Sequence, residues 1–252
     1  MKPYYHAHES AYQQIKSKGF FGWGNAKTLA DLGDERTNEY LRQVISDFFP
    51  VPAGKKALDI GCGSGTTAFT LAKIGFDVTG VDISATAIQM GQELASQQNL
   101  KINFVVGDVL ELEKFGQKFD VMYDSHCLHC IVFEEDRRKV LLGAKKSLTG
   151  AGIFILDTMV MPEVKYNPAD SSDTFFRFDE DFILWHKTKP SIGYGIIEKD
   201  GQHWCAQRRI YPPQKVLDEV AAASLNVISK RLDLQEDGQP SMLRLVLIPA
   251  QV

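Results

Sequence analysis

Hydrophobic and polar positions alternate in blocks of two kinds along most of the chain. Short apolar runs, typical of buried strands, are KALDI, DVTGVDI, KINFVVGD, KFDVMYDS and IFILDTMV, which begin at residues 56, 77, 101, 118 and 153. Between them, residues 66–75, 84–99 and 134–148 have apolar positions three and four apart, as in helices with one buried face. Short buried strands that alternate with amphipathic helices predict a parallel sheet covered on both faces.

Further elements flank this alternation. Residues 37–49 and 212–225 have helical spacing, and TGAG (149–152) is expected to be a turn. Residues 226–235 and 241–250 resemble strands, and the short link EDGQP between them requires an antiparallel pairing. The predicted fold is a doubly wound α/β fold with a mostly parallel, seven-stranded, Rossmann-like sheet and an antiparallel C-terminal hairpin.

Two aromatic-rich regions lie outside the alternation and predict a cover over the ligand-binding end of the sheet. The expected organisation is a helical N-terminal cover at 1–35 and an α/β core that binds a cofactor at 36–160. An insertion at 161–211 would cover the site, and residues 212–252 would complete the core with a helix and antiparallel strands.

Carboxylates stand where the predicted parallel strands end. Asp59 and Asp82 end the first two strands, Asp108 directly follows the third, and Asp124 ends the fourth; Asp157 lies near the end of the fifth. Ligands of open α/β sheets bind beyond the carboxyl ends of the strands, so these side chains are expected around one site. Such a ring of acids suits a ligand with hydroxyls, an amine and a positive centre.

The glycine-rich stretch ALDIGCGSGTTA (57–68) follows the first strand and allows close approach to its backbone. It lacks the G-K-[ST] of phosphate-binding loops. Gly63 begins a G-x-G-x-x-A pattern that also fits a dinucleotide site, so a nicotinamide-dependent oxidoreductase is an alternative. A pyrophosphate there would meet Asp59 and Asp124, and one like-charge pair about 4 Å apart costs roughly 4 kcal/mol at an effective dielectric near 20.

Five motifs in order resemble the class I S-adenosylmethionine-dependent methyltransferases. They are LDIGCGSG (58–65), GVDIS (80–84), GDVLEL (107–112), FDVMYDSHCLHCI (119–131) and SLTGAGIFIL (147–156). The resemblance is close over residues 38–160 and moderate over 205–250. It implies a Rossmann-like fold, S-adenosylmethionine as cofactor and S-adenosylhomocysteine as product.

The resemblance also implies roles for individual residues. Asp82 would bind the ribose hydroxyls, Asp108 and the Val109 N–H the adenine, and the glycine loop the methionine part. The whole expected cofactor set is Asp59, Gly61, Cys62, Gly63, Ser64, Gly65, Asp82, Ile83, Asp108, Val109, Asp124 and Ser125. An alternative for the aspartates is that they only cap helices and turns, where Asp is common.

The stretch SHCLHC (125–130) offers candidates for metal binding and for catalysis. Structural zinc sites usually draw ligand pairs from two separated segments, and a second pair is missing, so no metal is expected. His126 is the candidate for proton transfer, because an unperturbed histidine pKa near 6.5 suits a general base. His129 resembles a family histidine that is often structural. The expected substrate contacts are Tyr5, Trp23, His129, Trp185 and His186.

The composition restricts the chemical class of the methyl acceptor and the expected cellular location of the protein. The 252 residues carry a formal net charge of −4, which argues against nucleic acid. No stretch approaches the roughly 20 apolar residues of a membrane helix, and four cysteines without framework spacing suggest a cytoplasmic protein with reduced thiols. The expected activity is in-line methyl transfer to an oxygen, nitrogen or sulfur atom of a small molecule. A non-catalytic cofactor-binding sensor or partner subunit is the main alternative. The sequence leaves the acceptor and the oligomeric state open.

Overall fold

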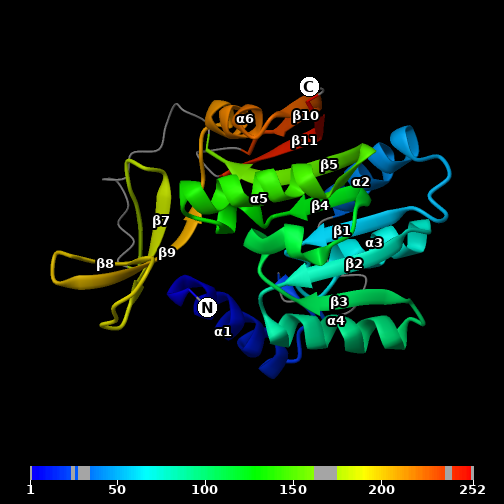
Figure 1. The fold of residues 1–252 in the computed structure, drawn as a ribbon. Helices are drawn as coiled ribbons and strands as arrows, with labels where there is room; N and C mark the ends of the chain where they lie inside the picture. Colours follow the sequence, from blue (N-terminus) through cyan, green and yellow to red (C-terminus); the bar gives the residue numbers. More distant parts are fainter. Residues whose placement is uncertain (1, 24–25, 28–34, 162–174, 236–239, 251–252) are drawn as a thin grey trace.

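A seven-stranded sheet forms the centre of the protein (Figure 1). The computed structural model describes the chain apart from residues 1, 24–25, 28–34, 162–174, 236–239 and 251–252. In spatial order, the strands of the sheet are β10 (Leu225–Asp233), β11 (Ser241–Pro249), β5 (Leu148–Val160), β4 (Phe119–Ser125), β1 (Lys56–Ile60), β2 (Asp77–Asp82) and β3 (Ile102–Val106). Strands β1 to β5 pair in parallel, whereas β11 pairs antiparallel with both β5 and β10. The predicted fold class is confirmed.

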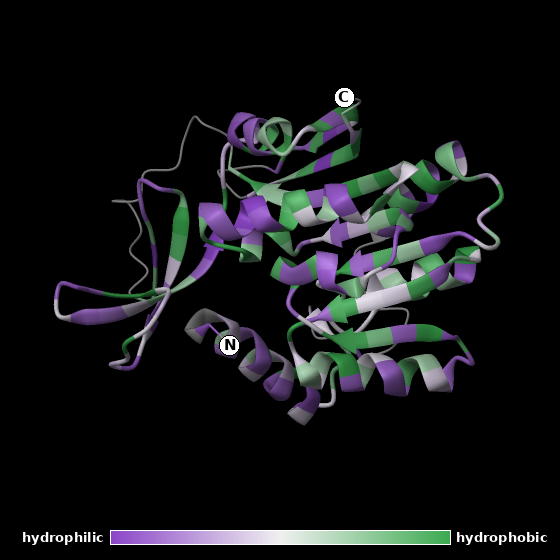
Figure 2. Cartoon of the chain, viewed as in Figure 1, coloured by the Kyte–Doolittle hydropathy of each residue, from purple (hydrophilic) through white to green (hydrophobic). Residues whose placement is uncertain are grey.

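Helices pack on both faces of this sheet. One hydrophobic cluster joins it to α2 (Glu35–Phe48), α3 (Thr66–Ile74) and α4 (Ala85–Gln97). The other joins it to the 3-10 helix η2 (Val109–Phe115), α5 (Glu134–Ser147) and α6 (Pro213–Ala222). Hydrophobic residues are concentrated along the central strands in Figure 2. The described helices include none that is both long and apolar enough to span a bilayer.

The local signals in the sequence explain why these elements form where they do. Along β1, Leu58 and Ile60 belong to one cluster and Ala57 to the other, because successive strand residues point to opposite faces. Ser84 caps α4 by accepting a hydrogen bond from the Ala87 N–H at 3.0 Å. α3 ends at Gly75, whose φ of 115° is accessible to glycine.

The order of the strands reverses at β1, which pairs with β2 on one side and β4 on the other. Chains leave neighbouring strands in opposite directions at such a point and open a crevice beyond their carboxyl ends. The loops after β1 and β4 therefore flank the place where a ligand of this fold binds.

A separate antiparallel sheet follows the core. Its order is β6 (Phe176–Phe178), β7 (Ile183–Thr188), β9 (Gln202–Arg209) and β8 (Ile196–Lys199). It projects from the main sheet beside the N-terminal helix α1 (Pro3–Ser17), and α1 contacts both α4 and β9 (Figure 1). In its described part, residues 175–211, the aromatic-rich insertion therefore forms a small sheet, which its sequence pattern did not predict.

Two local predictions differ from the structure. TGAG (149–152) belongs to β5 and is not a separate turn; β4 pairs with the residues on either side of it, Leu148 and Ile153, across a register shift between Phe119 and Val121. The link between β3 and β4 contains η2, a 3-10 helix capped by Asp108, which the sequence analysis did not identify. Most of EDGQP, at 236–239, lies outside the described residues.

Candidate active site

A cavity of about 610 Å³ opens at the carboxyl ends of β1, β2 and β4. This volume is typical of sites for small molecules and cofactors. The predicted residues that line it are Tyr5, Trp23, Asp59, Gly61, Cys62, Gly63, Ser64, Asp82, Ile83, Asp108, Val109, Ser125, His126 and His129. The structure thus brings most of the predicted site residues to one place.

The glycine loop after β1 has two positions that leave no room for a side chain. Gly61 and Gly63 have φ values of 65° and 54°, in the left-handed region that favours glycine. A Cβ at Gly61 would lie 2.5 Å from Cys127 Sγ, and one at Gly63 would lie 2.1 Å from Tyr12 Oη. The loop therefore presents bare backbone to the cavity, as close approach to a ligand requires.

Asp82 links this loop to the second strand. Its Oδ2 accepts a hydrogen bond from the Gly63 N–H at 2.9 Å, and its Oδ1 accepts one from the Ser84 N–H at 2.8 Å. His8 Nε2 lies 3.7 Å from Oδ1. A carboxylate has about four acceptor positions, so Asp82 keeps capacity for two hydroxyl donors from a ligand.

Two further aspartates in the cavity wall cap local structure. Asp59 accepts a hydrogen bond from the Ala68 N–H at 2.8 Å in the first turn of α3. Burial raises the pKa of Asp59 well above its ordinary value, and the nearby Asp124 and Asp82 carboxylates raise it further. Asp108 accepts from the Leu110 N–H at 2.9 Å. Asp59 and Asp108 therefore do cap local structure, as the alternative interpretation expected, but both side chains also border the cavity.

Asp124 is buried beneath the site and does not line the cavity. Its Oδ1 accepts hydrogen bonds from the N–H groups of Cys127 and Leu128 at 2.8 and 3.2 Å. Among the described residues, its buried Oδ2 has no hydrogen-bond partner. Burial raises the pKa of Asp124 to about 7. A cation bound nearby would favour the ionised form of this carboxyl group.

His126 occupies a strained position at the end of β4. Its φ is 70°, a left-handed conformation that is uncommon for residues with a side chain and that clusters at functional sites. Its N–H donates to the Asp157 carbonyl at 2.9 Å. This conformation places His126 in the cavity wall, with its ring 5.7 Å from that of His129.

His129 is held as a neutral hydrogen-bond donor. Its Nδ1 accepts from the Met159 N–H at 3.2 Å, and Thr158 Oγ1 lies 3.4 Å from the same nitrogen. Burial lowers the pKa of His129 well below its ordinary value. A neutral imidazole that accepts at Nδ1 carries its proton on Nε2, so His129 suits donation to a ligand and not proton abstraction.

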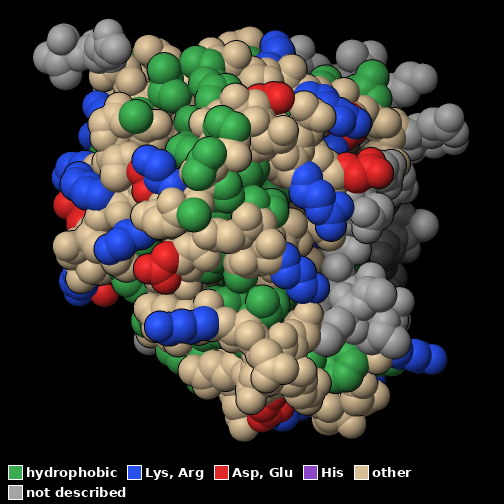
Figure 3. Space-filling view, turned by 90° about the vertical axis from the view of Figure 1, so that its right-hand side faces the viewer, with side chains coloured by type: hydrophobic (Ala, Val, Ile, Leu, Met, Phe, Trp, Pro, Cys, Tyr) green, Lys and Arg blue, Asp and Glu red, His purple; other side chains and the backbone are tan. Residues whose placement is uncertain are grey.

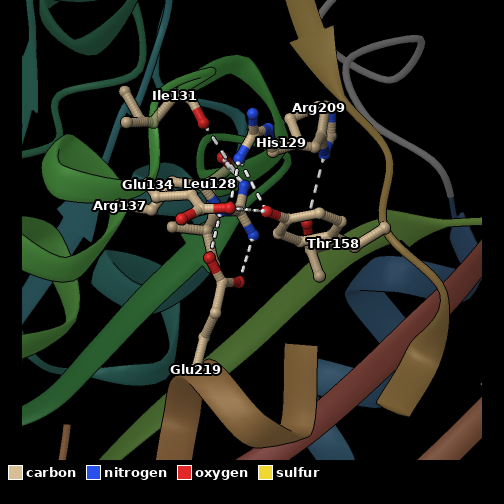
Figure 4. Close-up of polar contacts among 9 residues, drawn as sticks. Leu128, His129, Ile131, Glu134, Arg137, Thr158, Arg209 and Glu219 are labelled. Atoms are coloured by element: carbon tan, nitrogen blue, oxygen red, sulfur yellow. Dashed lines mark hydrogen bonds and ion pairs between the residues drawn. The ribbon is translucent and has the colours of Figure 1, made fainter. Parts of the chain in front are cut away.

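Arg137 of α5 supports the turn that carries both histidines (Figure 4). This side chain is 1% exposed, and its Nη1 donates to the carbonyls of Leu128 and Ile131 at 2.7 and 3.3 Å. Its Nε and Nη2 each donate to a Glu219 carboxylate oxygen at 2.6 Å. One arginine therefore joins the turn after β4 to α6.

The helix α1 forms one wall of the cavity. Glu9 accepts from Ser84 Oγ at 2.6 Å and from Thr86 Oγ1 at 2.5 Å, at the start of α4. Lys2, near the other end of α1, forms an ion pair with Asp136 of α5. These contacts hold Tyr12, which is 3% exposed, over the glycine loop.

Some predicted site residues lie away from the cavity lining. Trp185 is buried in the small sheet, where its indole N–H donates to Asp179 at 2.6 Å, and His186 stacks near Phe176. Gly65 does not line the cavity, because a Cβ there would meet the Phe104 ring at 2.6 Å.

Asp157 does not join the carboxylate ring, because Arg244 Nε donates to it at 3.0 Å within the core. In the part of the chain that the structure describes, no group of three or more His, Cys, Asp or Glu residues is arranged to hold a metal ion.

Sequence reasoning missed several residues that line the cavity. These are Ala7, His8, Ala11, Tyr12, Thr37, Asn38, Thr66, Thr67, Cys127, Cys130, Ile131, Met159, Ala206, Gln207 and Arg208. The i, i+4 spacing of His8 and Tyr12 on a helix could have indicated a shared face. Arg208 carries no local signal, because its place depends on the packing of the small sheet against the core.

Comparison with known proteins agrees with this geometry. The methyltransferase domain family matches residues 52–208. The ubiquinone biosynthesis O-methyltransferase of Coxiella burnetii (strain Dugway 5J108-111) is 33% identical over 106 residues, which is 42% of this chain and 44% of that protein. The enzyme of the same name from Rickettsia bellii (strain OSU 85-389) is 29% identical over 54% of this chain and 55% of its own length. The chain thus matches about half the length of these curated relatives.

Solved structures share the fold over nearly the whole chain. An S-adenosylmethionine-dependent methyltransferase from Clostridium acetobutylicum ATCC 824 superposes with a TM-score of 0.63 and 14% identity, and covers 98% of this chain and 99% of its own. Identity this low supports the fold alone, whereas the family match covers more than half of the sequence. The resemblance seen in the five motifs is confirmed, and the chain belongs to the class I family of methyltransferase domains.

Proposed function

We propose that this chain is an S-adenosylmethionine-dependent methyltransferase that acts on a small-molecule acceptor. The observation that carries the proposal is the division of one cavity into two unlike ends. Bare glycine backbone and the carboxyl groups of Asp59, Asp82 and Asp108 border one end, and His126, His129 and Arg208 border the other. The first end fits a cationic nucleoside, and the second fits a molecule that reacts with it.

The residues at the acidic end fit the parts of S-adenosylmethionine. The two free acceptor positions of Asp82 match the two ribose hydroxyls, and Asp108 and Val109 border the space for the adenine. The bare backbone at Gly61 and Gly63 suits the methionine part. When bound, the cofactor would supply a methyl group activated by a sulfonium, and its positive charges would favour the ionised form of Asp59, whose pKa burial otherwise raises.

The chain's contribution to methyl transfer is positioning and exclusion of water. A nucleophile held close to an activated methyl group and aligned with the breaking bond gains much of its rate from position alone. α1 and β9 cover part of the site, which reduces its contact with water. For a hydroxyl acceptor, His126 takes the proton from the nucleophile as general base, while His129 Nε2–H donates to an acceptor oxygen.

The surroundings of the site favour a small acceptor. Tyr5, Trp23, Ile131 and Met159 add apolar surface to the cavity, enough for a partly apolar molecule. On the face shown in Figure 3, at the amino ends of the parallel strands and so away from the cavity, Lys and Arg side chains are scattered among acidic and hydrophobic ones. The absence of a nucleic-acid partner and the cytoplasmic location stay predictions of the sequence.

Calorimetry with S-adenosylhomocysteine tests the cofactor assignment. Asp82→Ala removes two charge-assisted hydrogen bonds to the ribose, which should cost about 2–4 kcal/mol, or roughly 30- to 1,000-fold in affinity. Asp77→Ala is the matched control, because Asp77 is an exposed carboxylate at the other end of β2. Equal affinities for the two variants, or displacement of the ligand by micromolar NADH, would refute the proposal.

Turnover separates an enzyme from a cofactor-binding sensor. Wild type should convert S-adenosylmethionine to S-adenosylhomocysteine in the presence of small hydroxyl, amine or thiol acceptors, as measured by mass spectrometry. His126→Gln should lower this rate for hydroxyl acceptors and leave cofactor affinity unchanged. Tight binding of the cofactor with no methylation of any acceptor class would favour the sensor.

A further inference from the structure

The charges in the cavity point to the chemistry of the acceptor. Among the described residues that line it, Arg208 is the sole lysine or arginine. It lies near the end of β9, close to His129 and Cys130. A permanent cation therefore faces the part of the cavity that the proposed function gives to the acceptor.

Arg208 lacks the carboxylate partner that the buried arginines have. In the described part of the chain, each buried arginine pairs with an acid: Arg137 with Glu219, Arg209 with Glu134 and Arg244 with Asp157. The half-buried Arg208 instead directs Nη1 at Met159 Sδ, 3.9 Å away. A thioether is a weak acceptor, and a guanidinium has five donors.

The thiol near Arg208 does not supply the missing negative charge. Cys130 interacts with the guanidinium, but burial raises the pKa of the thiol above its ordinary value. Cys130 is therefore a neutral thiol at physiological pH. The guanidinium donors are left for an anion from outside the chain.

A β-bulge directs this arginine into the cavity. Leu184 of β7 pairs with Arg208, but the next residue, Trp185, pairs with Ala206, so Gln207 is extra on β9. Side chains of a regular strand alternate between faces, yet the three consecutive residues from Ala206 to Arg208 all line the cavity. Bulges re-aim side chains in this way and are frequent next to active sites.

We propose that Arg208 binds a carboxylate on the methyl acceptor, so that the substrate is a small, partly apolar carboxylic acid that also carries the nucleophile. This inference rests on the proposed methyltransferase function. The planar guanidinium matches a carboxylate through two parallel hydrogen bonds. The acids at the cofactor end repel the same group, so the carboxylate lies at Arg208 and the nucleophile lies toward His126.

The test compares ligands that differ only in charge. The protein is saturated with S-adenosylhomocysteine and titrated with benzoate, 4-hydroxybenzoate, 3,4-dihydroxybenzoate and 3-phenylpropionate, each beside its carboxamide. In wild type, at least one acid should bind roughly 10- to 100-fold more tightly than its amide, the range of a charge-assisted hydrogen bond. Arg208→Met should abolish the preference and Arg208→Lys should retain part of it.

The control variant removes a similar arginine from the same small sheet. Arg177 lies on β6 and stacks on Trp204 with its guanidinium carbon 5.5 Å from the ring, outside the cavity lining. Arg177→Met should keep the preference for the acid. No preference for any acid in wild type, or an unchanged preference in Arg208→Met, overturns the proposal.

The affinity for S-adenosylhomocysteine, measured in the same titrations, separates two failures. If wild type does not bind it, the proposed function fails. If wild type binds it and Arg208→Met loses 10-fold or more of that affinity, Arg208 binds the carboxylate of the cofactor and the inference about the acceptor is wrong. Unchanged cofactor affinity together with a lost acid preference supports the inference.

Discussion

Arg137 offers a sharp test of how the site is supported. Arg137→Met keeps much of the side-chain volume but removes the charge and all four hydrogen bonds to Leu128, Ile131 and Glu219. Two turn carbonyls then lose their donor, and the Glu219 carboxylate loses its cation. The turn that carries the two histidines of the site loses its link to α6.

The expected loss of stability follows from the burial of the two partners. Breaking a buried ion pair by removing one partner costs about 3–5 kcal/mol. The Glu219 side chain is 19% exposed, so water compensates in part, and we take the lower end, about 3 kcal/mol. For a chain of this size, that corresponds to a decrease in Tm of roughly 6–12 °C.

Denaturant and thermal unfolding of the single and double variants measure this loss. Arg137→Met/Glu219→Met replaces the ion pair with apolar side chains, which is often nearly neutral, so it should recover at least half of the loss. Glu135→Gln on the exposed face of α5 is the control and should change stability by less than about 1 kcal/mol. A loss below about 1 kcal/mol in Arg137→Met, or a double variant no more stable than the single one, would refute the reasoning.

Two further predictions concern Glu9 and Asp124. Glu9→Gln should weaken the docking of α1 by about 1–2 kcal/mol, seen as faster hydrogen exchange in α1. The control is Glu93→Gln, which removes an exposed pair with Lys16 and should have little effect. Equal hydrogen exchange in the two variants would contradict this prediction. Although burial raises the pKa of Glu9, hydrogen bonds from Ser84 and Thr86 lower it overall, so the contribution of Glu9 is lost as the pH falls through that lowered pKa. Burial raises the pKa of Asp124 from 3.8 to about 7, so its contribution to folding is complete below pH 3.8 and is lost as the pH rises to about 7. The unfolding free energy of wild type relative to Asp124→Asn should therefore fall by roughly 4 kcal/mol across that range, and a difference independent of pH would show that folding leaves the pKa of Asp124 unchanged.

The sequence by itself determined the core sheet and the part of the cavity that the glycine loop borders. Strands and helices follow from apolar spacing, which depends on neighbours within a few residues. The aspartates at the strand ends come together because parallel strands end at one edge, so Asp59, Asp82 and Asp108 needed no tertiary information beyond the strand order. The glycine loop could also be recognised from the sequence, because the backbone conformations that require glycine depend only on nearby residues.

The tertiary structure alone decided how Arg208 reaches the cavity and how the buried charges pair. Asp157 looked like a member of the carboxylate ring, but Arg244, 87 residues away, pairs with it in the core. Trp185 looked like a substrate contact, but it is buried in the hydrophobic core and does not line the cavity, while Arg208 reaches the cavity through a bulge. Such contacts join residues far apart in sequence, and their energy depends on burial and on which partner is nearest. Neither quantity leaves a periodic pattern along the chain.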